Sequence, residues 1–290
     1  MYYYVGKPDY SGMTEEEKKE QEPVNAYNSK VLDAILDDDS DKFIEILSEK
    51  KANETDINYQ FKMTNYKFPE IALYNPPIAS LCALFNSEKC FYALIQQFSE
   101  GLNSEQLQKK DRMSRSLMHF AAFGGNLRII KDLEKAGYDL NEKDGTRKTP
   151  SHYSAISGTT EVMKYIISKG IKIFYNVEYG SMTPLHMACL YGNLEVVKFI
   201  CETANPIDLI EADSYHSNYY RNLTPLHLAC EAGNDDIVNY FLTKDVMWKK
   251  QINALNREGR SPLLIAVQYG NLECVKALMR TGKAKLHLKG

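Results

Sequence analysis

The sequence predicts an all-α solenoid of about seven helix–turn–helix units. Three observations support this prediction. A Thr-Pro-Leu-His segment recurs along the chain, each copy carries signals for one short helix and then a second, and the copies are nearly evenly spaced. In such stacks each unit contacts only its neighbours, and the core grows with every added unit. The 290 residues are therefore expected to form one continuous body, although length alone suggests about two domains.

The clearest copy, residues 224–234, carries signals for starting and ending one short helix. Thr224 is a favourable N-cap residue, and Pro225 fits the first helical position, where its missing N–H costs nothing. Gly233 suits a left-handed helix end, and Asn234 is expected to cap the following helix. The unit is therefore a helical hairpin. Its apolar faces comprise Leu226, Ala229 and Cys230 in the first helix, and Ile237, Val238, Phe241 and Leu242 in the second.

The hairpin recurs with a period close to 33 residues. Aligned on the histidine, the anchors are His119, His152, His186, His227 and Leu264, which gives steps of 33, 34, 41 and 37 residues. Thr-Pro-Leu-His-x-Ala at a period of about 33 residues is the signature of the ankyrin repeat. The chain therefore resembles the ankyrin-repeat family, and the resemblance implies an ankyrin-repeat solenoid with β-turn fingers between the hairpins.

The fingers and the ends of the chain complete the expected organisation. Gly145 and Gly259 lie in two finger sequences and are expected at positive φ. The first unit is degenerate, with Asp33 in the histidine slot, as a terminal repeat should be. The last helix pair has no polar capping repeat after it, which leaves open a fragment of a longer protein or an end face used for self-association. We expect units near 24–53, 75–110, 114–145, 147–180, 181–222, 223–258 and 259–290, a flexible or docked tail at 1–23 and an aromatic insertion at 54–74.

Composition narrows the classes of partner. A formal net charge of -3, from 35 basic and 38 acidic residues, provides no positive field for nucleic acid or anionic lipid. No window approaches the roughly 20 apolar residues that span a bilayer, and the N-terminus does not read as a signal peptide. Cys82, Cys189 and Cys230 occupy one slot of three units, which indicates small core residues and reduced thiols. We therefore expect a cytoplasmic protein, with a nuclear location also open, and no membrane insertion.

The four histidines at equivalent positions raise the question of a metal site. Neighbouring helices pack at ~10 Å, which is too far for their imidazoles to share one zinc ion at ~2 Å. The resemblance implies that this histidine instead hydrogen-bonds the helix start to its neighbours. Cys189 and Cys230 each follow a histidine by three residues, but they stand where alanine stands in sister units, which favours packing. No nucleotide-binding, zinc-protease or hydrolase motif occurs, so we predict no catalytic residue, no cofactor and no metal.

The positions that vary between units are the predicted binding surface. The resemblance implies that partners bind finger tips and the exposed face of each first helix, at the two positions after Ala-Cys. Tyrosine and arginine, which are enriched at binding hot spots, recur there. The alternative is that the tyrosines at the tips pack on the next finger. The predicted protein-binding residues are Phe123, Arg147, Ile156, Tyr179, Met182, Leu190, Tyr191, Tyr215, Tyr219, Tyr220, Arg221, Glu231, Arg257, Arg260, Gln268 and Tyr269.

These observations predict a non-catalytic interaction module or scaffold that binds a protein partner through its concave face and finger loops. Three alternatives stay open: a regulatory or targeting region of a larger enzyme or channel, a structural protein that self-associates through the last unit, and an enzyme with an unrecognised site. Twenty tyrosines together with abundant asparagine and lysine are typical of an AT-rich genome, such as that of a unicellular eukaryotic parasite.

Overall fold

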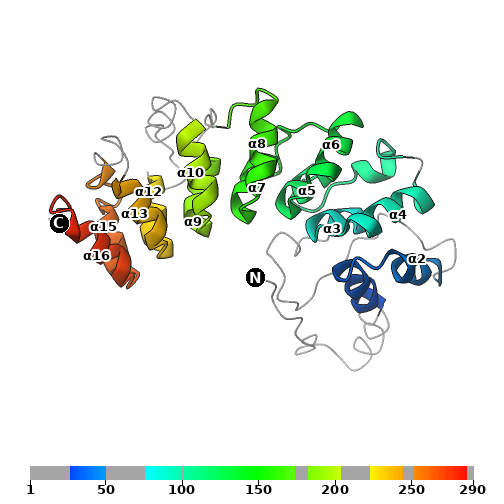
Figure 1. Cartoon of the computed structure of the whole chain (residues 1–290), viewed down its shortest axis with the longest axis horizontal. Coiled ribbons are helices and arrows are strands. Elements are labelled where there is room, and N and C mark those ends of the chain that lie inside the picture. Colours follow the sequence, from blue (N-terminus) through cyan, green and yellow to red (C-terminus); the bar gives the residue numbers. More distant parts are fainter. Residues whose placement is uncertain are drawn as a thin grey trace. The chain divides into compact units, whose positions relative to one another are not determined.

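The computed structural model describes residues 27–49, 76–99, 101–173, 182–203, 223–243 and 251–285. Its elements are helices joined by turns (Figure 1), which confirms the all-α fold class. The chain divides into two compact units, unit 1 (1–150) and unit 2 (151–290). The predicted tail at 1–23 and the aromatic insertion at 54–74 lie outside the described residues. The predicted repeat boundaries stay a prediction.

Unit 1 holds three helix pairs in its described part. In the first pair, a helix over residues 27–36 precedes α2 (Ser40–Glu49). The helix α2 packs on α4, α3 packs on α4 and α5, and α5 packs on α6. The remaining elements of this unit are α3 (Ile78–Leu84), α4 (Glu88–Phe98), the 3₁₀ helix η2 (Glu105–Gln108), α5 (Leu117–Gly124) and α6 (Leu127–Lys135).

Unit 2 holds four helix pairs in its described part. The first helices α9, α12 and α15 lie side by side in that order, and the second helices α10, α13 and α16 pack in the same order (Figure 1). Among the described helices, none is long and apolar enough to cross a bilayer. The pairs are α7 (Pro150–Ser157) with α8 (Thr160–Ser168), α9 (Pro184–Tyr191) with α10 (Leu194–Thr203), α12 (Pro225–Ala232) with α13 (Asp235–Thr243), and α15 (Pro262–Gln268) with α16 (Leu272–Arg280).

The helix α12 begins and ends as the sequence predicts. The Thr224 hydroxyl accepts a hydrogen bond from the His227 amide at 3.3 Å, and Pro225 is the first helical residue. Gly233 closes the helix in the left-handed region with φ 77°. The same signals bound α9, because Thr183 caps it and Gly192 ends it with φ 79°. Local sequence therefore sets the length of these helices at about two turns.

Every residue from Pro225 to Cys230 is buried, not only the predicted face. Leu226, Ala229 and Cys230 are 0% exposed, as predicted, but Leu228 is also only 2% exposed. The helix α12 packs against α9, α15 and α13 at once, so it has almost no solvent face. A helix surrounded in this way shows no strong amphipathic pattern in its sequence.

The asparagines at the turns between paired helices of unit 2 bond to the preceding helix pair, which is not the role predicted for Asn234. Asn234 was expected to cap α13, but its side-chain amide donates to the carbonyl oxygens of Cys189 at 2.7 Å and Leu190 at 3.3 Å. Asn271 donates in the same way to Cys230 at 2.7 Å and Glu231 at 2.9 Å. These bonds satisfy carbonyl groups at the C-terminal end of the preceding first helix, which lack partners inside their own helix. Each turn is thereby bonded to the helix pair before it.

The fingers are built on a buried or half-buried Asx side chain. The Asp144 carboxylate accepts backbone N–H groups two and four residues on, from Thr146 at 2.7 Å and Lys148 at 2.8 Å. Asn256 repeats the pattern with Glu258 at 3.0 Å and Arg260 at 2.9 Å. Asp111 does the same in the finger before α5. A short side chain that bonds its own backbone in this way fixes a tight turn.

One glycine prediction in the fingers is wrong. Gly259 has φ 71° as predicted, but Gly145 does not have positive φ, and Arg147 takes that conformation instead with φ 67°. Gly145 is needed for a close approach. Its N–H donates to the Met113 carbonyl of the preceding finger at 2.7 Å, and an added Cβ would lie 2.8 Å from that oxygen.

Replacing Gly145 with alanine is therefore expected to lower the free energy of unfolding by about 1–3 kcal/mol, because the new methyl group forces the two fingers apart. Equilibrium urea denaturation measures this change. Lys143→Ala, at an exposed position of the same finger, is the control and should change stability by less than about 0.5 kcal/mol. If the two variants had the same free energy of unfolding, the close contact between the two fingers would contribute nothing to stability.

Candidate protein-binding surface

The motif histidines hold each first helix to the next unit. The His227 Nδ1 accepts the Thr224 backbone N–H at 3.1 Å, which leaves the proton on Nε2, and Nε2 donates to the Arg260 carbonyl at 3.1 Å. His186 makes the equivalent bond to Leu223 at 3.1 Å. In each case the acceptor is the residue before the N-cap of the following first helix. His119 and His152 bond the equivalent carbonyls of Lys148 and Met182 at 3.2 and 2.9 Å.

The environment of these histidines is that of a structural group. Burial lowers the pKa of His186 and of His227 to about 4, so both imidazoles are neutral at pH 7. Both ring nitrogens are already used within the fold. The part of the chain that the structure describes holds no group of three or more metal-ligating side chains. The hydrogen-bonding role implied by the resemblance is thus confirmed.

The cysteines of the shared slot are packing residues. Cys82, Cys189 and Cys230 are 0% exposed, as predicted, and none of the three is in a disulfide. Burial raises the pKa of the Cys82 and Cys230 thiols well above the usual value. A nucleophilic cysteine needs an exposed thiolate, so these two thiols lack the environment for that chemistry.

The predicted surface is best formed at the C-terminal ends of α9, α12 and α15. Tyr191 is 50% exposed and Tyr269 is 49% exposed, and they hold the same position on two helices that flank α12 (Figure 1). Leu190 and Glu231 are half-buried at the preceding position, where α15 carries the exposed Gln268. These positions of three adjacent helices form one continuous strip.

The finger before α15 contacts this strip directly. The Arg260 guanidinium donates to the Gln268 side-chain oxygen at 2.6 Å and pairs with Glu258 at 2.9 Å. This end of the strip therefore lies against the base of that finger. Arg257 is exposed on the same finger, and Met182 is half-buried at the finger base before α9.

Other predicted residues lie apart from the strip or outside the described part. Phe123 is half-buried at the end of α5 and Arg147 is exposed on a finger, both in unit 1. Ile156 is half-buried at the end of α7 in unit 2. The predicted residues outside the described part of the chain are Tyr179, Tyr215, Tyr219, Tyr220 and Arg221.

The last helix pair carries exposed apolar side chains, as its lack of a polar capping repeat indicated. Val267 is 53% exposed, although Cys189 and Cys230 in the same slot are fully buried. Leu272 and Met279 on α16 are 60% and 45% exposed. The difference arises because α15 covers α12, whereas no described helix packs on the far side of α15.

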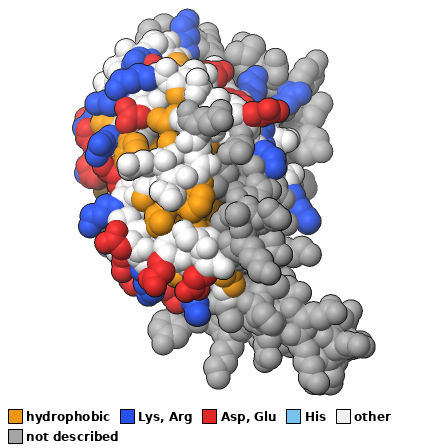
Figure 2. Space-filling view, turned by 90° about the vertical axis from the view of Figure 1, so that its right-hand side faces the viewer, with side chains coloured by type: hydrophobic (Ala, Val, Ile, Leu, Met, Phe, Trp, Pro, Cys, Tyr) orange, Lys and Arg blue, Asp and Glu red, His pale blue; other side chains and the backbone are white. Residues whose placement is uncertain are grey.

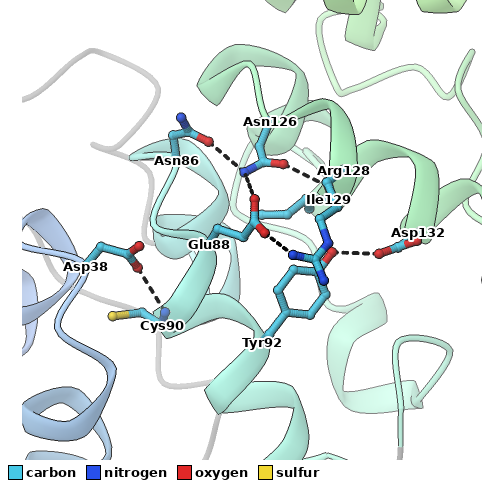
Figure 3. A network of polar contacts seen from close by, with 9 residues as sticks. All are labelled: Asp38, Asn86, Glu88, Cys90, Tyr92, Asn126, Arg128, Ile129 and Asp132. Carbon is cyan, nitrogen blue, oxygen red and sulfur yellow. Dashed lines mark hydrogen bonds and ion pairs between the residues drawn. The ribbon is translucent and has the colours of Figure 1, made fainter.

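A polar network in unit 1 was not predicted from the sequence (Figure 3). Asn126 caps α6 by accepting the Ile129 amide at 3.0 Å, and its NH₂ donates to Asn86 at 2.7 Å and Glu88 at 3.0 Å. Glu88 also pairs with Arg128. The network links the turn before α4 to the start of α6, in place of the bonds that the turn asparagines make in unit 2.

The same network ends at a tyrosine on α4. The Tyr92 hydroxyl donates to Asp132 at 2.6 Å, and the Arg128 guanidinium lies 4.7 Å from the Tyr92 ring centroid. Burial and this hydrogen bond raise the pKa of Tyr92. Because these charged groups pair with each other, the network stabilises the packing of α4 on α6.

Charge on the molecular surface is mixed. The face in Figure 2 shows blue and red side chains interspersed around small orange patches. Four of the described ion pairs join residues three positions apart on one helix, such as Lys164 with Glu161 at 2.6 Å. The described part of that face carries no large field of one sign, in keeping with the small net charge.

Comparison with known proteins decides the family. Residues 117–213 and 207–289 match the profile of "Ankyrin repeats (3 copies)", and together they span more than half of the 290 residues. The chain belongs to the ankyrin-repeat family. Ankyrin repeats imply a protein–protein interaction module, and the strip on α9, α12 and α15 is the best-formed candidate surface of these repeats.

Several curated ankyrin-region relatives are similar over short stretches. The chain is 38% identical over 53 residues to protein phosphatase 1 regulatory subunit 27 of Mus musculus, and 36% identical over 53 residues to the Homo sapiens protein. Each match covers 18% of this chain and 34% of the relative. Dauer abnormal formation protein 25 of Caenorhabditis elegans is 32% identical over 71 residues, 24% of this chain and 18% of that protein. The chain thus matches only about a fifth to a third of the length of these relatives.

Proposed function

We propose that this chain is a non-catalytic scaffold that holds a protein partner on its concave face and finger loops. The observation that carries the proposal is the pair of half-exposed tyrosines, Tyr191 and Tyr269, at one position of two first helices. Large aromatic side chains at that position contribute little to the core of their own unit. They are the residue type that dominates binding energy in protein interfaces. A cytoplasmic location accords with this proposal.

The test is the double substitution Tyr191→Ala with Tyr269→Ala. We expect the thermal midpoint to change little, because both side chains are half-exposed, and partner capture to fall at least about tenfold. Affinity capture with quantitative mass spectrometry measures the second effect. Tyr165→Ala, on the second helix α8, is a matched tyrosine control and should leave capture unchanged. Undiminished capture by the double variant would remove this surface from the proposal.

A regulatory role is the second candidate, favoured by two relatives that are named regulatory subunits of protein phosphatase 1. The chain would then be the targeting or regulatory part of a larger assembly. Binding of purified protein phosphatase 1 catalytic subunit, measured by calorimetry, tests this directly. Self-association through α15 and α16 is a separate hypothesis, and light scattering that shows a concentration-independent monomer would rule it out.

A further inference from the structure

The central helix pair of unit 2 carries negative charge that its own residues do not balance. Residues 224–243, which hold α12 and α13, contain three carboxylates and no lysine or arginine, for a formal charge of -3. Residues 183–203 contain two carboxylates and one lysine (-1), and residues 261–280 contain one carboxylate and two basic residues (+1). The carboxylates of the central pair are Glu231, Asp235 and Asp236.

Glu231 is the carboxylate of this set that lies in the predicted binding strip. Among the described residues, its side chain has neither a cation nor a hydrogen-bond donor, although it is half-buried. Other glutamates of the unit are paired, including Glu195 with Lys198 at 2.7 Å. A carboxylate without a counter-ion gains more from an incoming cation than a paired one does.

The position on α15 that is equivalent to Glu231 is Gln268, and it has a partner that Glu231 lacks among the described residues. There, Gln268 accepts a hydrogen bond from Arg260 at the base of its own finger, at 2.6 Å. In the α12 unit, the residue before the N-cap is Leu223, which carries no charge and no donor in its side chain. Among the described residues, this helix pair thus has a carboxylate at Glu231 and no guanidinium at the place where Arg260 stands before α15.

The flanking side chains suit the same ligand. Ala232 is exposed and presents only a methyl group, while Tyr191 and Tyr269 stand at its position on the helices to either side. Neighbouring helices pack at about 8–10 Å, and the two tyrosines lie on helices separated by two such steps. Their rings are therefore roughly 20 Å apart, with the small side chain of Ala232 between them. Aromatic rings attract Arg and Lys side chains, as Arg128 over the Tyr92 ring shows within this chain.

We propose that the surface formed by Tyr191, Glu231, Ala232 and Tyr269 takes a basic segment of the partner protein, with an arginine or lysine beside Glu231 and between the two tyrosines. The inference rests on the proposed function and adds the chemical class of the bound segment.

A phage-displayed library of random 12-residue peptides, panned on the full chain, tests this inference without a known partner. Selected peptides are expected to be enriched in arginine and lysine relative to the input library. Fluorescence anisotropy with the labelled peptides should show binding about tenfold weaker to the Glu231→Gln variant than to the wild type. Glu195→Gln is the matched control, because it removes the same charge from α10, and it should bind as the wild type does.

The outcomes separate this inference from the proposed function. Suppose that the binding of selected peptides depends on Tyr191 and Tyr269. If these peptides lack basic residues, or bind the Glu231→Gln variant as tightly as the wild type, the inference of a basic ligand is wrong, while the proposed binding surface stands. Selection of acidic or purely apolar peptides also overturns the inference, and so does a library that yields no binder. Peptides whose binding is unaffected by the double tyrosine substitution contradict the proposed function itself. A switch to acidic peptides in the Glu231→Lys variant would further support the inference.

Discussion

Replacing Asp111 with alanine is expected to lower the free energy of unfolding by about 3–5 kcal/mol, the largest loss we expect from a single charge in unit 1. Asp111 is 6% exposed and Arg115 is 4% exposed, and the Arg115 Nε donates to the carboxylate at 2.6 Å. The same carboxylate accepts the backbone amides of Met113 at 2.9 Å and Arg115 at 2.8 Å. Removing it takes the carboxylate acceptor from the buried Arg115 Nε and from two backbone amides.

Urea denaturation of Asp111→Ala and of a matched surface variant measures this effect. Glu161→Ala also breaks an ion pair, with Lys164 on α8, but both of those side chains are largely exposed. It should cost less than about 1 kcal/mol. A loss of similar size in the two variants would contradict the prediction, since it would mean that burial adds nothing to the Asp111–Arg115 pair.

Acidification is expected to destabilise the protein steeply between about pH 6.5 and about pH 4. Burial lowers the pKa of His186 and His227 from 6.5 to about 4. In that range the unfolded chain binds protons that the folded chain excludes, so stability falls as the pH is lowered. Each histidine contributes a slope of about 1.4 kcal/mol per pH unit in this window, and the contribution is fully present above pH 6.5.

The pH dependence of the free energy of unfolding, measured by urea denaturation at several pH values, tests this. The His227→Gln variant should show a slope that is shallower by about 1.4 kcal/mol per pH unit than that of the wild type. Leu226→Ala, in the same buried helix, lowers stability without removing a titratable group and should keep the wild-type slope. An unchanged slope in His227→Gln would show that this imidazole is protonated equally in the folded and unfolded states.

The repeat was predictable because its signals are local. Thr224 and Pro225 start α12 and Gly233 ends it through backbone geometry and one capping bond, each of which involves residues within a few positions. The buried cysteine slot was predictable for a related reason. A small apolar residue in the same place of several copies points to a contact that every copy makes.

The candidate surface was predictable only in part. Tyr191 and Tyr269 are exposed as the alignment of copies suggested, but Leu190 and Phe123 are half-buried. The sequence named Glu231 without indicating that its side chain has no counter-ion among the residues that the structure describes. That property depends on Leu223 standing where Arg260 stands in the next unit, and on the absence of any cation from α12 and α13.

The sequence by itself determined the hairpin, its caps, its period and its family, because these follow from short-range backbone preferences repeated along the chain. Only the tertiary structure decided which side chains bond the units together. It directs the Asn234 amide to Cys189 and Leu190 of the preceding unit, and it places Gly145 against the Met113 carbonyl while Arg147 takes the positive φ. These contacts join residues about 30 to 45 positions apart, and their geometry is fixed by how neighbouring units stack, which no local pattern contains.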